Sequence, residues 1–441
     1  MNSLVKYALT GAASILAIAA SPLAAQDMVI VNAKLVKGDG GEPIDNGVVV
    51  IEGGKVISAG AATGTTFETD TVVDANGSFV TPGLFAAVTT VGIWDVAAVS
   101  ESNDSRAGGS PFSAALDTAP VVNPANQHIK VNRAAGITRA ATMTTPAGSI
   151  FGGQGAIIDL GADGQPITKA RAFQTVVLGE YGANRAGGSR ASAYTLFRAS
   201  LREAQALAGS RGTPQTTEIT KGDDVMLNRF DAEALVPVVR GEQKLLVAVE
   251  RAVDIRNALG LKREFPALDM VLVGASEGWM VASDIAAAGV PVLADGLDDL
   301  PNAFEELAAT QSNIGRMKKA GVTVAINAAS MENTRRLSQY AGNLVALANV
   351  PGADGLTWGQ AFATISSVPA AIAGMGGQAG VLAPGAKADV VIWDGDPLEV
   401  GTVPTMVFID GVQQPLDNHQ SRLKERYRDL DESDLPKAYD W

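Results

Sequence analysis

The sequence contains no cysteine and only two histidines, His128 and His419. The absence of cysteine excludes disulfides, thiolate metal sites and a cysteine nucleophile. The scarcity of histidine is the tighter constraint, because imidazole is the commonest side-chain metal ligand. Positive charge is scarce as well, since 34 Lys and Arg face 47 Asp and Glu, giving a net charge of -13. That balance repels nucleic acid, which we therefore do not expect as a partner.

An apolar stretch near the N-terminus, Ala8 to Ala20, is too short for a comfortable membrane span. Lys6 precedes it and small residues follow it at Pro22 to Ala25, as in an export signal. We predict a signal peptide over residues 1–25 and a periplasmic or secreted mature chain with no membrane contact. The alternative is an uncleaved anchor.

The 441 residues are enough for one large domain and a smaller one. Residues 26–80 contain short β-type runs separated by Gly-Gly and Asn-Gly turns, which predict a small antiparallel unit. Over residues 81–379, strand-like runs alternate with Ala-rich helical stretches, a texture typical of a closed TIM-like (β/α)8 barrel. Residues 380–416 return to β character, so we predict an α/β fold in which a composite β domain is built from both chain ends. Residues 417–441 form a charged tail, expected to be a helix and an extended end.

Within the barrel region we expect strands at 137–142, 245–249, 270–273 and 322–326, and helices at 252–259 and 278–288. Residues 101–130, rich in Ser, Asn, Ala and Pro, predict a long loop over the barrel mouth. Loops of this length are often functional.

Two motifs at opposite ends of the chain carry a family resemblance. The run Gly380 to Pro397, GVLAPGAKADVVIWDGDP, resembles the closing motif of the amidohydrolase superfamily. The runs Asn46 to Gly60, NGVVVIEGGKVISAG, and Val73 to Leu84, VDANGSFVTPGL, are similar to its opening motif. The middle of the chain, including AGITR at 135–139 and GGQGA at 152–156, looks like the exported, imidazolonepropionase-like branch. The resemblance implies a TIM-like barrel with a side β domain and an ancestry in metal-assisted hydrolysis of carbon–nitrogen bonds.

The resemblance also implies a zinc or similar site, held by a His-x-His pair, further histidines and an aspartate at the ends of barrel strands. Such ligands lower the pKa of a bound water so that it can attack an amide. The positions that match these ligands here, with the residue that commonly precedes the pair, are Ala86, Val88, Thr90, Ala248, Gly274 and Ala329. We therefore expect no metal and no other cofactor, because losing every ligand removes both the cation and the activated water.

Charged residues after the predicted strands are the remaining candidates for ligand contacts. Glu250 and Arg251 follow the run 245–249, Glu277 follows 270–273, and Glu180 follows an earlier apolar run. Barrel folds place site residues in such loops. The alternative for each is an ion pair at the barrel rim, since charges removed from water are usually paired. His128, in a loop, and His419, in the tail, lack ligand spacing.

Two functions remain open. In the first, the protein is a pseudoenzyme, a diverged amidohydrolase-family protein without metal-dependent hydrolysis. It then acts as a periplasmic ligand-binding protein for a small molecule or as a partner subunit, in a homo-oligomer or with an active relative. In the second, it hydrolyses carbon–nitrogen bonds in non-peptide or small-peptide amides with a site rebuilt around Glu180, Glu250, Glu277 or Asp295. General acid–base catalysis alone contributes typically ~10²–10⁴-fold, which favours the first.

Overall fold

The computed structural model describes residues 25–62, 71–209, 226–296, 298–328 and 334–428. The predicted signal peptide lies outside these residues except for Ala25. The end of the charged tail and Ala329 also lie outside them. Within the described ranges, no helix combines the length and the apolar character needed to cross a bilayer.

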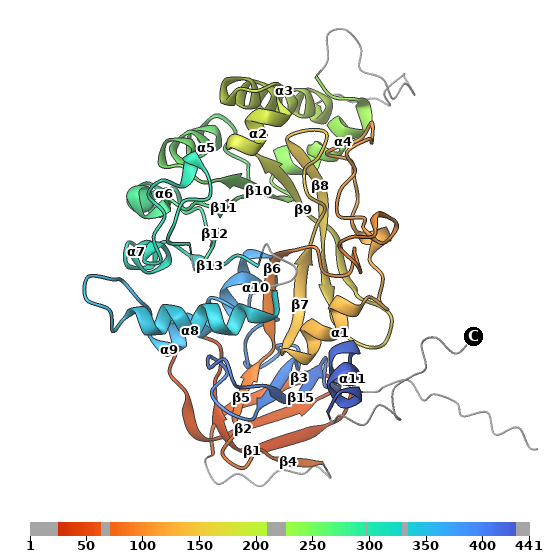
Figure 1. Ribbon diagram of the computed structural model, residues 1–441, viewed down its shortest axis with the longest axis vertical. Helices are drawn as coiled ribbons and strands as arrows, with labels where there is room; N and C mark the ends of the chain where they lie inside the picture. Colours follow the sequence, from red (N-terminus) through yellow and green to blue (C-terminus); the bar gives the residue numbers. More distant parts are fainter. Residues whose placement is uncertain (1–24, 63–70, 210–225, 297, 329–333, 429–441) are drawn as a thin grey trace, which may run out of the picture.

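One eight-stranded sheet forms a nearly closed barrel, with strand order β13-β12-β11-β10-β9-β8-β7-β6 (Figure 1). Its strands are β6 (Leu84–Thr89), β7 (Ile137–Thr142), β8 (Phe151–Asp159), β9 (Ile167–Val177), β10 (Lys244–Val249), β11 (Met270–Gly274), β12 (Val292–Ala294) and β13 (Val324–Ile326). The gap between β13 and β6 is bridged by main-chain hydrogen bonds. Ala328 N–H, after β13, donates to Ala87 O at 2.9 Å. Residues 364–365 also link the two strands, because Ile326 N–H donates to Thr364 O at 3.1 Å and Phe85 N–H donates to Ile365 O at 3.0 Å.

The barrel departs from a strict (β/α)8 pattern at β8. This strand runs antiparallel to both β7 and β9, whereas the other neighbouring strands are parallel. The connections on either side, residues 143–150 and 160–166, are short, and a parallel crossover needs a dozen or more residues. Alternating apolar and polar residues do not encode strand direction, which is why the sequence did not predict this reversal.

Helices lie on the outside of the barrel, against its inner core or beside the second sheet (Figure 1). They are α1 (Gln127–Ala134), α2 (Glu180–Arg185), α3 (Arg190–Gly209), α4 (Arg229–Val239), α5 (Ala252–Glu264), α6 (Ala282–Ala288), α7 (Asn313–Lys319), α8 (Leu337–Leu347), α9 (Trp358–Ala363), α10 (Ser367–Ile372) and α11 (His419–Arg426). Short 3-10 helices are η1 (Ser100–Ser102), η2 (Ala119–Val121), η3 (Gly278–Val281), η4 (Phe304–Glu306) and η5 (Thr334–Arg336). The helix predicted over 278–288 is therefore two elements, η3 and then α6.

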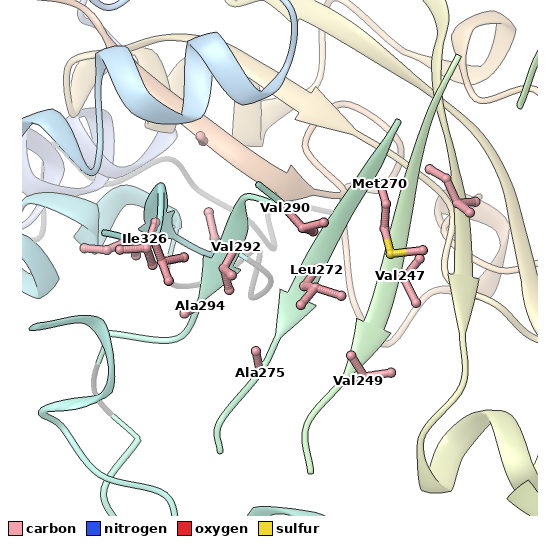
Figure 2. Close-up of a cluster of buried hydrophobic side chains, with 14 of the residues drawn as sticks. Val247, Val249, Met270, Leu272, Ala275, Val290, Val292, Ala294 and Ile326 are labelled. Carbon is pink, nitrogen blue, oxygen red and sulfur yellow. The ribbon is translucent and has the colours of Figure 1, made fainter. Parts of the chain in front are cut away.

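Strand side chains alternate between two cores. The outward-facing set packs against the helices and includes Val247, Val249, Leu272 and Val292, which lie side by side in Figure 2. The inward-facing set includes Leu246, Val271, Leu293 and Ala325 and packs onto residues of α10 and the turn after it. Because side chains alternate, a residue that lies an even number of positions beyond an inward-facing residue also begins on the inner face of the barrel.

The second sheet takes its strands from both ends of the chain, in the order β16-β15-β14-β5-β1-β2-β3 with β4 beside β1. The strands are β1 (Met28–Leu35), β2 (Ile44–Glu52), β3 (Lys55–Ala61), β4 (Val72–Asp74), β5 (Phe79–Pro82), β14 (Val390–Trp393), β15 (Pro404–Ile409) and β16 (Val412–Gln413). The two chain ends meet where β5 pairs with β14, Thr81 opposite Val391. A mixed α/β fold with a barrel and a second sheet, as predicted, is confirmed at this level.

A buried ion pair joins the barrel to the second sheet. Arg139 of β7 is 1% exposed and donates to the Asp389 carboxylate at 2.6 and 3.2 Å. The Nη2 of Arg139, which makes the 3.2 Å bond, also donates to Asp410 at 2.8 Å, and Lys387 lies 2.8 Å from the Asp410 carboxylate. Burial opposes ionisation of Asp410, but Arg139 and Lys387 outweigh it and lower its pKa below the usual value.

The segment predicted as a mouth loop, residues 101–130, begins beyond β6 and runs along the side of the barrel. Thr145 N–H, after β7, donates to Ser105 O at 2.8 Å. Farther on, Asp231 of α4 accepts from the main-chain N–H groups of Ser113 and Ala115, at 2.9 and 2.7 Å. The segment ends in α1, which starts at Gln127 rather than after residue 130.

Candidate functional site

The carboxyl ends of β10, β11, β12 and β13 form one side of the barrel mouth, the end that carries function in barrel enzymes. Leu246 and Leu293 belong to the inner core, so alternation places Glu250, beyond β10, and Asp295, beyond β12, on the inner side. Both side chains are partly buried. They form the centre of the candidate site.

Glu250 is held in one orientation by the next strand connection. Its Oε2 accepts from Ser276 N–H at 3.0 Å and from Ser276 Oγ at 2.8 Å. Gly274, the last residue of β11, has φ +84°, and a Cβ there would lie 1.9 Å from Glu250 Oε1. The glycine thus leaves the space that the Glu250 carboxyl fills, at the position where the resemblance puts a histidine ligand.

The two carboxyls resist ionisation. Burial raises the pKa of Glu250 to about 8, with the negative charges of Asp295 and Glu306 adding to the rise and the Ser276 bonds opposing it. Burial likewise raises the pKa of Asp295 to about 7, with further contributions from Asp298 and Glu306. At neutral pH the Glu250 carboxyl is therefore mostly protonated, and the Asp295 carboxyl is present in both its protonated and its ionised form.

Asn327 completes this side of the mouth. Its N–H donates to Ala294 O at 2.8 Å, which continues the parallel pairing of β12 with β13. Ala325 faces the inner core, so Asn327 begins on that same face, next to Asp295. The side chain is 5% exposed, and its Oδ1 accepts no hydrogen bond from the residues that the structure describes. A buried amide oxygen without a partner is uncommon in proteins.

The other three sequence candidates lie in contacts at the barrel rim. Glu277 Oε2 accepts from Ala252 N–H at the start of α5 at 2.9 Å, and its Oε1 accepts from Ala308 N–H at 3.3 Å. Arg251 lies 3.2 Å from Asp254. These positions fit the rim ion-pair and helix-terminus roles that the sequence left open.

Glu180 belongs to a second part of the rim, centred on Arg190. This guanidinium lies 3.5 Å from Glu180, 3.1 Å from Asp254 and 2.9 Å from Glu305. Glu305 also accepts from Glu180 N–H at 2.7 Å, where α2 begins. Among the candidates, the structure brings together Glu250 and Asp295, whereas the contacts of Glu180, Glu277 and Arg251 are with rim residues.

The positions that the resemblance gives to metal ligands carry side chains without ligand atoms in most cases. Ala86 and Val88 are buried at 0% and 5% exposure, in the outer and inner cores. Ala248 belongs to β10 and Gly274 to β11, and Thr90, just after β6, is partly buried. Within the described residues, no group of three or more His, Asp or Glu side chains is arranged to hold a metal ion. The donor set therefore does not fit a zinc centre.

The two histidines lie on helices outside the strand ends. His128, in α1, stacks on Trp94 with ring centroids 4.5 Å apart, and its Nε2 is 3.1 Å from Asp95 O. His419 is the exposed first residue of α11. Sequence reasoning missed Asn327, which directly follows a predicted strand, and Ser276, which lies three residues after one, because the search there was for ligand residues.

Comparisons with known proteins agree with this architecture. Residues 252–414 match the amidohydrolase family. The crystal structure of an amidohydrolase from Thermotoga maritima is similar, with a TM-score of 0.74 at 23% identity, covering 88% of this chain and 99% of that one. A molinate hydrolase structure has a TM-score of 0.55 at 14% identity, covering 89% and 95%.

A curated relative, amidohydrolase TasK of Hapsidospora irregularis, is 45% identical over 60 residues. The match covers 14% of this chain and spans only 6% of the relative's length. Residues 252–414 are thus similar to the amidohydrolase family, and the fold is shared with solved structures of hydrolases. The match over residues 252–414 agrees with the coarse family prediction, and the imidazolonepropionase-like branch stays a prediction.

Proposed function

We propose that this protein is a non-catalytic amidohydrolase homologue that binds a small molecule at the carboxyl end of its barrel. The observation that carries the proposal is at Val88. This residue stands where the resemblance puts a metal ligand, and it packs within the inner core. A metal-activated hydroxide needs imidazole or carboxylate ligands around one point. Ala86, Ala248 and Gly274 offer none, so the ligand would bind without metal or other cofactor.

The proposed location is the periplasm, or outside the cell, on the strength of the signal-like residues 1–25. A role as partner subunit, in a homo-oligomer or with an active relative, is part of the proposal. Three large apolar side chains between β12 and α7 support it, because Leu300, Phe304 and Leu307 are 77%, 81% and 65% exposed. Exposed apolar side chains that lie together commonly mark interaction surfaces.

A second candidate is a carbon–nitrogen hydrolase with a rebuilt site. The observation in its favour is the pair of carboxyls with different raised pKa values, about 8 at Glu250 and about 7 at Asp295. Such a pair can serve as general acid and general base near neutral pH. This catalysis contributes typically ~10²–10⁴-fold, well below what amide hydrolysis needs.

The deciding experiment is the metal content of the purified mature protein, by mass spectrometry after exposure to zinc and washing. We expect far less than one metal ion per chain. Retention near one equivalent would overturn the metal-free proposal. A screen of amide substrates tests the second candidate. Hydrolysis that is lost in Glu250→Gln but kept in Glu233→Gln, whose carboxylate pairs with Arg229 on α4, would establish the rebuilt site.

A further inference from the structure

Glu250, Asp295 and Asn327 follow the ends of β10, β12 and β13 and begin on the inner face of the barrel mouth. Ala294 pairs with Ile326, and continuing this register sets Asp295 beside Asn327, one strand spacing apart. Glu250 is two strands from Asp295, about 10 Å at the main chain. Its carboxyl shortens that separation, because it fills the space over Gly274 on the intervening strand.

The oxygen atoms at this point are largely unpaired. Asp295 makes no hydrogen bond or ion pair with the described residues, and both Ser276 bonds to Glu250 use Oε2, which leaves Oε1 without a partner there. Asn327 Oδ1 is buried and equally unpartnered. Such a set accepts hydrogen bonds and donates none when the carboxyls are ionised. It is complementary to a group that carries several donors and a positive charge.

The surrounding charges strengthen this preference. Asp298 and Glu306 both act on Asp295, and Glu306 acts on Glu250. None of the four carboxylates forms an ion pair within the described chain, since the nearby Arg251 and Arg190 are bound to Asp254 and Glu305. Tyr340 lies near the group, because Asp295 and Asp298 act on its hydroxyl, as does Arg336.

We infer that the ligand of this barrel is an organic cation whose primary ammonium group is bound by Glu250, Asp295 and Asn327. The inference rests on the proposed function and names its ligand class. An ammonium group has three donors and no acceptor, which matches one free oxygen from each of the three side chains. Charge-assisted hydrogen bonds to two carboxylates supply the affinity, and the amide oxygen fixes the third donor.

A carboxylate or phosphate ligand would be repelled by four acidic side chains at this point. A small divalent cation is the other positively charged occupant. It is disfavoured because Ca²⁺ takes six to eight oxygen ligands and Mg²⁺ near-ideal octahedral geometry, whereas this point offers three side chains. Binding of such an ion is one of the outcomes that the test separates.

The test uses three probes that share a phenylethyl group: 2-phenylethylammonium, 3-phenylpropanoate and 2-phenylethanol. Binding to the full mature protein is measured by calorimetry at about pH 8.5, where both carboxyls are mostly ionised and the ammonium stays charged. We expect the ammonium to bind at least about tenfold more tightly than the other two. Affinity should fall as the pH is lowered through about 8 and about 7.

Glu250→Gln and Asp295→Asn are each expected to weaken ammonium binding by about tenfold or more, since each removes a charge-assisted contact. Asn327→Ala should weaken it by a smaller factor, and Glu233→Gln, on α4 away from the mouth, should leave it unchanged. Circular dichroism and melting curves confirm folding of each variant. The comparison of probes on the unaltered protein remains decisive if a variant does not fold.

Equal or tighter binding of the alcohol or the carboxylate would overturn the inference and leave the proposed ligand-binding function standing. Failure of all three probes would overturn it too, and metal content would then decide the proposed function separately. Tight binding of Mg²⁺, Ca²⁺ or Zn²⁺ that depends on Glu250 would overturn both, because the site would then hold a metal ion.

Discussion

The contact between Gly274 and Glu250 leads to a prediction that depends on geometry alone. In Gly274→Ala the new Cβ would lie 1.9 Å from Glu250 Oε1, so the carboxyl must leave and lose its two bonds from Ser276. Those bonds contribute roughly 0.5–1.5 kcal/mol each. The left-handed backbone, φ +84°, adds about 1–2 kcal/mol for any residue with a Cβ. We expect the free energy of unfolding to fall by about 3 kcal/mol.

The matched control is Gly352→Ala. Gly352 has a similar φ, +81°, but a Cβ there would meet no atom within 4 Å. It should therefore lose only the backbone contribution of about 1–2 kcal/mol.

The double variant Gly274→Ala with Glu250→Ala separates the two effects further. With the carboxyl removed, the added methyl meets no carboxyl, so the double variant should be more stable than additivity predicts by about 1–2 kcal/mol. Urea denaturation followed by circular dichroism measures the unaltered protein, the single variants Gly274→Ala, Gly352→Ala and Glu250→Ala, and the double variant. Strict additivity, or equal losses in Gly274→Ala and Gly352→Ala, would refute the assignment of this space to Glu250.

Three other predictions follow. The raised folded-state pKa of Glu250, about 8, means that the unfolded chain releases its proton first, so stability should fall as pH rises from about 4.5 to about 8, and less steeply in Glu250→Gln. A denaturation series across pH that shows equal slopes for the two proteins contradicts this. Arg139→Met leaves Asp389 buried without its cation and should cost about 3–5 kcal/mol, whereas an unchanged melting temperature would show that the pair is dispensable. Asp231→Ala removes the acceptor of two main-chain N–H groups and should increase hydrogen exchange at Ser113 and Ala115, and unaltered exchange there would count against this anchor.

Much of the fold could be predicted from local patterns. The run Ile137–Thr142 is a strand with the predicted bounds, and α5 begins at the predicted Ala252. Strand direction at β8 and the division of residues 278–288 could not be predicted, because they depend on loop geometry and on packing against neighbouring elements. Periodicity reports which face is apolar and says nothing of these.

The candidate site was predictable in part. The loops after β10 and β11 contain Glu250 and Glu277, as expected from the sequence. Their different roles could not be predicted, since Glu277 reaches the start of α5 while Glu250 fills the space above a glycine on the adjacent strand. Asn327 had a usable signal, a polar residue directly after a buried strand. Its missing hydrogen bond, however, is a property of three-dimensional packing alone.

The pairing of β5 with β14 has a consequence for the order in which the chain can fold during synthesis. About 300 residues separate the two strands, which at roughly 5–20 residues per second means tens of seconds of translation. Until then β5 lacks the neighbour on one edge, and Arg139 lacks the carboxylate that neutralises it. A ribosome-bound chain therefore carries an unpaired sheet edge and an uncompensated barrel charge, two features that favour its retention by chaperones until the last strands emerge.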